Sequence, residues 1–365
     1  MNAAAPRAAW AARLSAVSFL DAAKARALLD ALGPDGLDRA PAADWAAAAG
    51  LGAERAERWR REALAFDPEG EFRRLEALGG TCLLRGEPGY PELLASVPDA
   101  PLVLYAWGRL EDLPGVAVVG SRAPTAYGRR MARRLAADLA RRRVATVSGL
   151  ARGIDAEAHE AALDAGGTTW AVLGSGLGEV YPPDNRDLAR RIVAEGGCLL
   201  SEYPMRTTPR RETFPSRNRI VAALSWATVV VEGRAGSGAR LTAANAAEYG
   251  REVLAVPGPA DSPLSELPHR LLRQGARVAA EASDVLAVLP PGEAARPQSP
   301  RRPRPELEAD ERRVMTVLGG ESLSLDELAG VTGLDMARLS LIMFGLEIKD
   351  LVSAVPGQRY AKKDR

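Results

Sequence analysis

Residues 144–155 read Val144-Ala145-Thr146-Val147-Ser148-Gly149-Leu150-Ala151-Arg152-Gly153-Ile154-Asp155, an apolar run of β type that leads into a glycine-containing turn. We predict a strand that ends at Ser148 and Gly149, followed by a helix that Asp155 caps. Glycine lets the backbone approach a ligand closely, so Gly149 and Gly153 are expected to face phosphate, with Arg152 as a charged donor beside them. A capped turn without a ligand is the plainer alternative.

A second segment of the same kind, residues 116–119, leads into Gly120-Ser121-Arg122. Turn amides beside a helix start can face an anion, and the Arg122 guanidinium can bind a phosphate through two donors. Counted from Gly115, the spacing imitates a Walker A loop. The four residues between the glycines are apolar, as in a strand, and arginine stands in place of the lysine. The sequence therefore argues against ATP hydrolysis here.

A third segment, Phe214-Pro215-Ser216-Arg217-Asn218-Arg219, offers an aromatic face next to two guanidinium groups and an amide. Stacking on Phe214 and charged contacts from Arg217 and Arg219, with Asn218 beside them, suit an unpaired base and its phosphates. Taken together, the three segments predict a groove for a polyanion that carries bases.

Two further glycine-rich turns are less specific. Glu232, Ser237-Gly238 and Thr242 follow a predicted strand, and their hydroxyl groups could either donate to phosphate or fix the loop. Gly174-Ser175-Gly176 resembles a dinucleotide fingerprint, but Tyr181-Pro182-Pro183 stands where the binding helix should begin. That turn favours tight packing over a cofactor site, and we expect no cofactor.

Apolar segments alternate with helical ones through the middle of the chain. Strands are predicted at residues 116–119, 144–147, 169–173, 198–201, 227–231 and 252–256, and helices at 129–142, 155–165, 187–195, 218–225 and 241–249. Continuous apolar strands between helices indicate an α/β fold, an extended Rossmann-like, doubly wound and mostly parallel sheet covered on both faces. Right-handed crossovers then bring the glycine-containing loops to one edge of that sheet.

The ends of the chain differ from this pattern. Residues 1–68 are predicted to form a helical module of SAM or helix-hairpin-helix type, residues 69–290 the sheet domain, 291–305 a Pro- and Arg-rich linker, and 306–365 a winged helix. The hairpin at residues 50–52 has no following lysine, which favours packing over DNA binding. The third helix of the winged helix offers Arg338 and Lys349 against Glu347 and Asp350, which favours protein interaction or a structural role over DNA reading.

The distribution of charge is more informative than its sum. The formal net charge is +1, yet eight arginines and a single acidic residue, Asp138, lie between Ser121 and Arg143. Five more arginines lie between residues 206 and 219. A solvated helix face is an equally good interpretation of residues 129–143.

Other features narrow the function class. Cys82 and Cys198 lack metal or disulfide spacing, and His159 and His269 have no ligand-spaced partners, so neither a metal nor a disulfide framework is expected. The apolar stretch at residues 14–20 is too short for a signal peptide, and no stretch is long enough for a membrane span. We expect a cytoplasmic location. No arrangement of catalytic nucleophile and base is evident, so binding is favoured over bond breaking.

Taken in order, these segments resemble the DNA-processing protein A family (DprA, also called Smf). The matching motifs are Gly89-Tyr90-Pro91, Val118-Val119-Gly120-Ser121-Arg122, residues 148–155, Gly174-Ser175-Gly176 with Tyr181-Pro182 and Asn185, Ser201-Glu202-Tyr203-Pro204, residues 214–220, Glu232, Ser237-Gly238, Thr242-Ala243 and Gly250-Arg251-Glu252-Val253. They extend over roughly two hundred residues in one order.

The resemblance implies a cytoplasmic protein that binds single-stranded DNA on its Rossmann domain. Members of this family dimerise, protect incoming DNA during natural transformation and help to load RecA recombinase. Carried over to this chain, Ser121 and Arg122 would hold a phosphate, Phe214 would stack on or wedge between bases, and residues 217–219 would bind backbone and base edges. The chain departs from the family at Leu267-Pro268-His269, where members have a Gly-x-Asn element.

Two other functions remain open at this point. A related class of nucleoside-monophosphate phosphoribohydrolases (LOG) uses a Gly-Gly-x-Gly-Thr-x-x-Glu loop, and aligning Gly238 with its last glycine puts Ala239 and Thr242 where the threonine and glutamate belong. The catalytic carboxylate is thus missing from the sequence. The other possibility is an adaptor whose terminal domains bind proteins.

Overall fold

We describe a computed structural model of the chain, for residues 6–292, 307–318, 322–348, 351–355 and 359–362. The chain divides into two compact units, residues 1–300 and 301–365, and each is described by itself. Most of the predicted linker, residues 293–305, lies outside the described residues.

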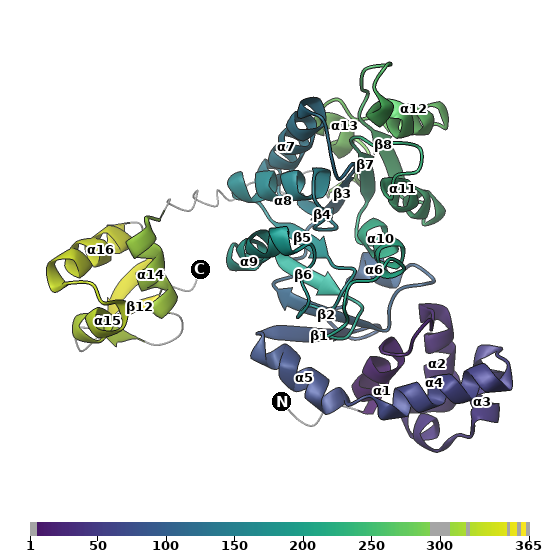
Figure 1. The fold of residues 1–365 in the computed structure, drawn as a ribbon. Helices are drawn as coiled ribbons and strands as arrows, with labels where there is room; N and C mark the ends of the chain where they lie inside the picture. The colour runs from purple at the N-terminus through teal and green to yellow at the C-terminus, as the bar shows by residue number, and fades with distance from the viewer. Residues whose placement is uncertain (1–5, 293–306, 319–321, 349–350, 356–358, 363–365) are drawn as a thin grey trace. The chain divides into compact units, whose positions relative to one another are not determined.

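A nine-stranded sheet forms the centre of the first unit, with the strand order β1-β2-β6-β5-β4-β3-β7-β8-β9 (Figure 1). The strands are β1 (Gly80–Leu84), β2 (Val103–Gly108), β3 (Gly115–Val119), β4 (Ala145–Ser148), β5 (Thr169–Val172), β6 (Cys198–Ser201), β7 (Ala227–Val230), β8 (Glu252–Ala255) and β9 (Arg277–Val278). All pairs from β6 to β9 are parallel. The order reverses between β3 and β7, which is the switch point of a doubly wound sheet. The predicted mostly parallel α/β fold is confirmed.

The edge strands β1 and β2 depart from the parallel pattern. Both run antiparallel, β1 to β2 and β2 to β6, in register with Leu83 opposite Leu104 and Ala106 opposite Leu200. Neither they nor the two-residue strand β9 were among the strands predicted from sequence. The sheet is therefore wider than predicted by three strands, all at its edges.

Helices cover both faces because side chains alternate along each strand. Val116 and Val118 of β3 pack with α7 (Ala126–Arg141), α8 (Ile154–Asp164) and α13 (Ala282–Leu286). Ala117 and Val119 pack with α10 (Thr213–Ala223), α11 (Ala239–Glu248) and α12 (Glu266–Arg273) on the other face. Figure 1 shows these two sets of helices on opposite sides of the sheet.

Five helices precede the sheet: α1 (Pro6–Ser15), α2 (Ala22–Arg39), α3 (Ala42–Ala49), α4 (Ala53–Ala65) and α5 (Pro68–Ala77). Their buried side chains, among them Trp10, Trp45 and Trp59, belong to the same hydrophobic cluster as Tyr105 of β2 and Ile192 of α9 (Arg186–Ala194). The helical module is thus packed against the sheet edge within one unit.

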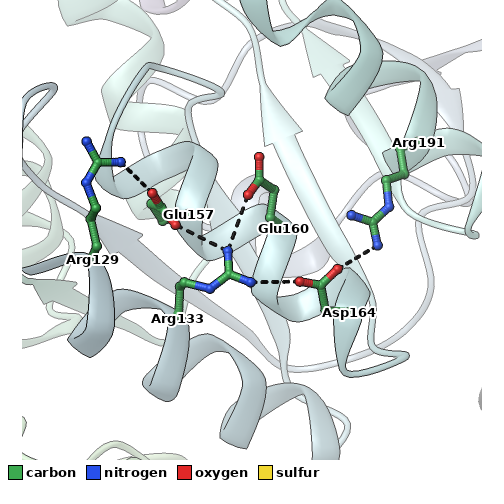
Figure 2. A network of polar contacts seen from close by, with 6 residues as sticks. All are labelled: Arg129, Arg133, Glu157, Glu160, Asp164 and Arg191. Atoms are coloured by element: carbon green, nitrogen blue, oxygen red, sulfur yellow. Dashed lines mark hydrogen bonds and ion pairs between the residues drawn. The ribbon is translucent and has the colours of Figure 1, made fainter. Parts of the chain in front are cut away.

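Two arginines of α7 are paired with acids of the neighbouring helix. Figure 2 shows Arg133 among Glu157, Glu160 and Asp164 of α8, at distances of 3.2, 3.3 and 2.8 Å. Arg129 lies 2.6 Å from Glu157. For these two arginines, the alternative interpretation as a solvated helix face is the one that the structure supports.

The second unit has the topology of a winged helix. It comprises α14 (Ala309–Val317), β10 (Leu323–Ser324), α15 (Leu325–Thr332), α16 (Met336–Ile348), β11 (Val352–Val355) and β12 (Arg359–Lys362), with the sheet order β10-β12-β11. Its core contains Val314, Leu328, Leu339 and Met343. Among the described residues, no single helix is long and apolar enough to cross a membrane. The α15 and α16 segments pass that test only together, with a 111° bend between them.

Candidate functional site

The glycine-containing loops predicted from sequence meet at the carboxyl ends of β3, β4, β5 and β7. The loops after β3 and β4 are joined directly, since the Ile154 backbone N–H donates to the Ser121 carbonyl oxygen at 3.1 Å. Gly153 has φ +80°, and a Cβ there would lie 2.4 Å from the same oxygen. The glycine is therefore required by the contact between the loops, rather than by room for a ligand.

Gly120 has a similar explanation. A Cβ at this position would lie 2.8 Å from Ile154 Cγ1 and 2.9 Å from the Glu232 carbonyl oxygen. The side chain of Ser121, which is half-buried, accepts a hydrogen bond from Ala123 N at 3.1 Å. The loop after β3 is thus held by its own contacts and leaves Arg122 exposed.

A buried glutamate fixes the other side of this loop. Glu232, at the end of β7, accepts hydrogen bonds from Thr125 N at 2.9 Å and Thr125 Oγ1 at 2.5 Å. Thr125 Oγ1 in turn accepts from Gly128 N at 3.1 Å and caps α7. Gly128 must be glycine because a Cβ would lie 2.3 Å from Glu232 Oε2.

Arg217 lies in the interior, in contrast to the expectation that it faces a DNA backbone. Its side chain projects from the first turns of α10 onto the ends of β4 and β5, where it donates to the carbonyl oxygens of Gly149 and Val172. The residue is only 3% exposed. A Cβ at Gly149 would lie 2.4 Å from the guanidinium, so Gly149 makes room for Arg217 and not for a phosphate.

Asp155 supports the same buried arrangement. It was expected to cap α8, but Gly153 is the N-cap residue, and Asp155 Oδ2 instead accepts from Gly149 N at 3.0 Å and from Ala151 N at 3.4 Å. Burial raises the pKa of Asp155, while the charge of Arg217 opposes that shift. Burial likewise lowers the pKa of Arg217 to about 10, with Asp155 again opposing the shift.

Three side chains, two from loops and one from the first turn of α10, meet on the exposed side of this framework. The Arg122 guanidinium lies 5.7 Å from the centroid of the Phe214 ring, and the Tyr181 ring lies 5.6 Å from the same centroid at an angle of 49°. Gly174, after β5, gives the Phe214 ring space, because a Cβ there would lie 2.9 Å from it. Tyr181 is 40% exposed. We call Arg122, Tyr181 and Phe214 the aromatic cluster.

Arg152 lies on the adjacent loop and is exposed. Its Nε donates to Asp184 Oδ2 at 2.7 Å, which raises the pKa of Arg152. Asn185 Nδ2 donates to the Leu150 carbonyl oxygen at 2.8 Å and ties the same two loops together. Both contacts lie beside Tyr181 in the chain.

The remaining predicted residues of α10 and α11 are engaged with protein groups. Arg219 pairs with Glu202 and lies 3.8 Å from Asp99. Asn218 Nδ2 donates to the Gly238 carbonyl oxygen at 3.3 Å, and Ser237 Oγ accepts from Ala239 N at 3.3 Å. Thr242 is buried within α11. Of the two roles considered for Ser237, the hydrogen bond to Ala239 N supports a role in fixing the loop.

The structure thus brings the predicted residues together at one edge, but on two levels. Gly149, Arg217 and Thr242 are buried beneath the surface, whereas Arg122, Arg152 and Gly238 are exposed. The sequence analysis did not include Tyr181 in the site, although the residue lies in a motif that supported the resemblance. The available signal was an aromatic residue in the loop after a predicted strand.

Metal chemistry has no support in the described part of the chain, where no cluster of three or more His, Cys, Asp or Glu side chains is arranged to hold an ion. His159 is buried with Nδ1 at 2.6 Å from Thr169 Oγ1, and burial lowers its pKa to about 3. His269 Nε2 lies 3.0 Å from the Gly258 carbonyl oxygen.

The fold and this edge define a Rossmann-like binding protein with a winged helix in a separate unit. The chain belongs to the DNA recombination-mediator protein A family, whose sequence model matches residues 81–290. The family's winged helix domain matches residues 298–358, which confirms the predicted winged helix. A DNA-processing role follows from this membership.

Known proteins agree with this assignment. The chain is 38% identical to Protein Smf of Synechocystis over 314 residues, which cover 76% of this chain and 79% of that protein. The crystal structure of DNA processing protein A from Streptococcus pneumoniae is similar with a TM-score of 0.66 and 32% identity, over 78% of this chain and 97% of that one. DNA processing protein A from Helicobacter pylori, described for its single-stranded DNA binding mode, gives a TM-score of 0.51 and 29% identity, over 56% and 93% of the two chains.

Proposed function

We propose that this protein binds single-stranded DNA, with little dependence on sequence, along the edge formed by the loops after β3, β4 and β5 and the start of α10. The observation that carries the proposal is the aromatic cluster, in which the exposed Arg122 and the ring of Tyr181, from two separate loops, both contact the ring of Phe214. An aromatic face takes a base of any sequence, and a guanidinium takes the phosphate beside it.

The buried level supports this function indirectly. Arg217, Asp155 and Glu232 hold the loops in place, so the aromatic cluster is presented on a fixed framework. Preorganised contacts lose less conformational entropy when a ligand binds. Of the residues predicted from sequence, four remain proposed DNA contacts: Ser121, Arg122, Arg152 and Phe214. Five others are proposed to shape the loops instead: Gly120, Gly149, Gly153, Arg217 and Thr242.

The relatives support a finer proposal. The Helicobacter pylori protein is described for its single-stranded DNA binding mode, and 93% of it matches 56% of this chain. We therefore propose that this chain acts as a cytoplasmic homodimer that protects incoming single strands during natural transformation and helps to load RecA. The proposed activity involves no bond-breaking step.

The test is fluorescence anisotropy with an oligonucleotide and with its own duplex, in a salt titration. Preference for the unpaired form is expected because the rings of Tyr181 and Phe214 can stack only on bases that are not paired. Equal affinity for the duplex would contradict the proposal. A second measurement adds RecA to the complex and follows RecA filament formation on the DNA, which should be faster with the protein than without it.

A further inference from the structure

A cavity of about 870 Å³ lies behind α10, between the α1–α2 loop of the helical module and the loop from Glu202 to Thr213. This volume is within the range of roughly 300–1,000 Å³ that is usual for ligand sites. Thr213, Ser216 and Arg219 of α10 line it. The aromatic cluster uses Phe214 of the same helical turn, so only the width of a helix, about 10 Å, separates the cavity from the proposed DNA site.

The α1–α2 loop places an aromatic ring at this cavity. Phe19 is 81% exposed, and its backbone has φ +59°, a conformation that a phenylalanine rarely adopts. Ser18 N donates to Glu62 Oε2 at 2.9 Å, which anchors the loop to α4. A bulky apolar side chain held out in solvent, on strained backbone, is costly unless it serves contact with another molecule.

The facing loop supplies positive charge at the surface. Arg206 and Arg210 line the cavity and are exposed, and neither has an ion-pair partner among the residues that the structure describes. An exposed ring opposite two guanidinium groups repeats the chemistry of the aromatic cluster. Phosphate contacts and base stacking are the two interactions that this chemistry provides.

The inner wall of the cavity is polar and carries three carboxylates, of Glu71, Asp99 and Glu202, against the two guanidinium groups of Arg74 and Arg219. Glu202 pairs with Arg219, Asp99 accepts from Tyr249 at 2.8 Å, and Glu71 pairs with Arg74 at 2.9 Å. Arg219 Nη1 and Glu202 Oε1 have no hydrogen-bond partner in the described part of the chain. These two atoms are buried from solvent, so the excess of carboxylates decides the character of the wall, which suits a neutral, polar nucleobase better than a phosphate.

We propose that the cavity is a second binding site for the same unpaired strand, which crosses the first turn of α10 after leaving the aromatic cluster. Phe19 stacks on a base that enters the cavity, and Arg206 and Arg210 hold the adjoining phosphates. The N-terminal helical module is thereby part of the DNA-binding surface. This inference rests on the proposed function, because it requires a strand already bound at Phe214.

The test compares thymidine homopolymers of two lengths, one of about 6 nucleotides that covers only the aromatic cluster and one of about 16 that reaches the cavity. For the long strand, Phe19→Ala should weaken binding roughly 5- to 160-fold, the range for one lost stacked base. For the short strand, the same variant should bind like the wild type, which also shows that it is folded. Phe19→Trp should restore long-strand affinity, and Arg206→Ala with Arg210→Ala should weaken it.

A matched control with Arg130→Ala and Arg134→Ala on α7 removes the same charge away from the cavity. The inference is overturned if the long strand binds no tighter than the short one, if Phe19→Ala leaves the long strand unaffected, or if it weakens both lengths equally. Phe214→Ala separates the two proposals, because it should weaken both lengths. If it changes neither, the proposed function itself fails.

Discussion

At the residue scale, the arginines of this chain fall into three chemical groups that their spacing does not distinguish. Arg122 is exposed against an aromatic ring, Arg129 and Arg133 are paired with acids of α8, and Arg217 is buried among carbonyl oxygens. Among the described residues, Arg122, like the exposed Arg206 and Arg210, has no ion pair to break before it binds a phosphate. Counts of positive charge therefore overstate the DNA-binding surface.

Arg122→Ala should weaken binding of single-stranded DNA and lower its salt dependence. Each phosphate contact contributes about 0.7 to the slope of log affinity against log salt concentration for a single strand, so the loss of one contact should flatten the slope by about that amount. Anisotropy titrations at several salt concentrations measure this. Arg133→Ala serves as the control and should leave the slope unchanged. An unaltered slope in Arg122→Ala would contradict the proposal that Arg122 contacts a phosphate.

Phe214→Ala should cost about 1–3 kcal/mol of single-strand binding free energy, since one base loses its stacking partner. Tyr181→Ala should cost less, because Phe214 keeps its own contact with Arg122. Binding titrations give both values, and denaturant unfolding reports stability in parallel. A loss of stability without a loss of affinity would identify Phe214 as a packing residue only.

The sequence alone could identify Arg122 and Phe214, since an exposed loop after a strand and an aromatic residue beside arginines are visible in it. The burial of Arg217 was not predictable in this way. The helix was predicted to begin at residue 218, but α10 begins at Thr213. Within a helix, residues 213, 217, 220 and 221 share one face, and that face is buried.

At the scale of elements, α10 depends on Arg217 for its position across the ends of β4 and β5. Arg217→Ala leaves Asp155 buried without its positive neighbour and two carbonyl oxygens without their donor. We expect a loss of about 3–5 kcal/mol in the free energy of unfolding, measured with denaturant. Arg211→Ala, an exposed neighbour, is the control. A variant that loses DNA affinity at unchanged stability would instead assign Arg217 a direct contact.

His159 connects α8 to the sheet and makes stability depend on pH. Thr169 Oγ1 donates to the Thr146 carbonyl oxygen at 2.7 Å, so His159 Nδ1 is the donor to Thr169. Nε2 is buried and has no hydrogen-bond partner among the described residues. Protonation of Nε2 is therefore unfavourable, and the pKa falls to about 3 in the folded chain. The unfolded chain binds this proton near the ordinary value of about 6.5.

Stability from His159 is therefore fully present above about pH 6.5 and is lost as the pH falls, by up to about 1.4 kcal/mol per pH unit. Denaturant unfolding between about pH 5 and 6.5, above the range of most carboxyl groups, measures this slope. His159→Leu should show a flatter slope in the same window. Identical slopes in the two proteins would show that the histidine does not titrate on unfolding.

Burial alone did not decide which strands were predictable, because β8 was predicted with two of its four residues buried, and β2 was missed with four of its six residues buried. The six central strands have continuous apolar runs, and their predicted bounds agree with the structure within about one residue at each end. The antiparallel direction of β1 and β2 could not be derived from the same kind of run, because an apolar segment carries no information on the direction of its partner. β9 has two residues, both exposed, and no pattern to detect.

At the scale of the whole molecule, the two compact units have separate hydrophobic cores. In the winged helix, Arg338 of α16 is paired with Asp310 at 2.8 Å, and the exposed face of the helix carries Leu341 and Phe344. Among the described residues of this helix, none offers the unpaired positive charge that a DNA-reading helix presents.

Removal of residues 301–365 should leave both the single-strand affinity and its salt slope unchanged, because the proposed contacts all lie in the first unit. Anisotropy titrations of the truncated and full chains make the comparison. Circular dichroism and thermal unfolding provide the control for folding. A reduced salt slope after truncation would mean that the winged helix contributes phosphate contacts of its own.

The carboxylate of Glu232 has one more consequence for what this fold can accept. In doubly wound proteins the amino end of the helix after the first strand is where a diphosphate settles, drawn by the backbone amides. In this chain the Glu232 carboxylate already occupies the position at the start of α7, where it accepts hydrogen bonds from Thr125. The phosphates of a small nucleotide bound at this helix end would be repelled by the Glu232 carboxylate. A polymer that binds along the outer edge of the loops would avoid this repulsion. We therefore expect this fold to favour a polymeric ligand over a small nucleotide.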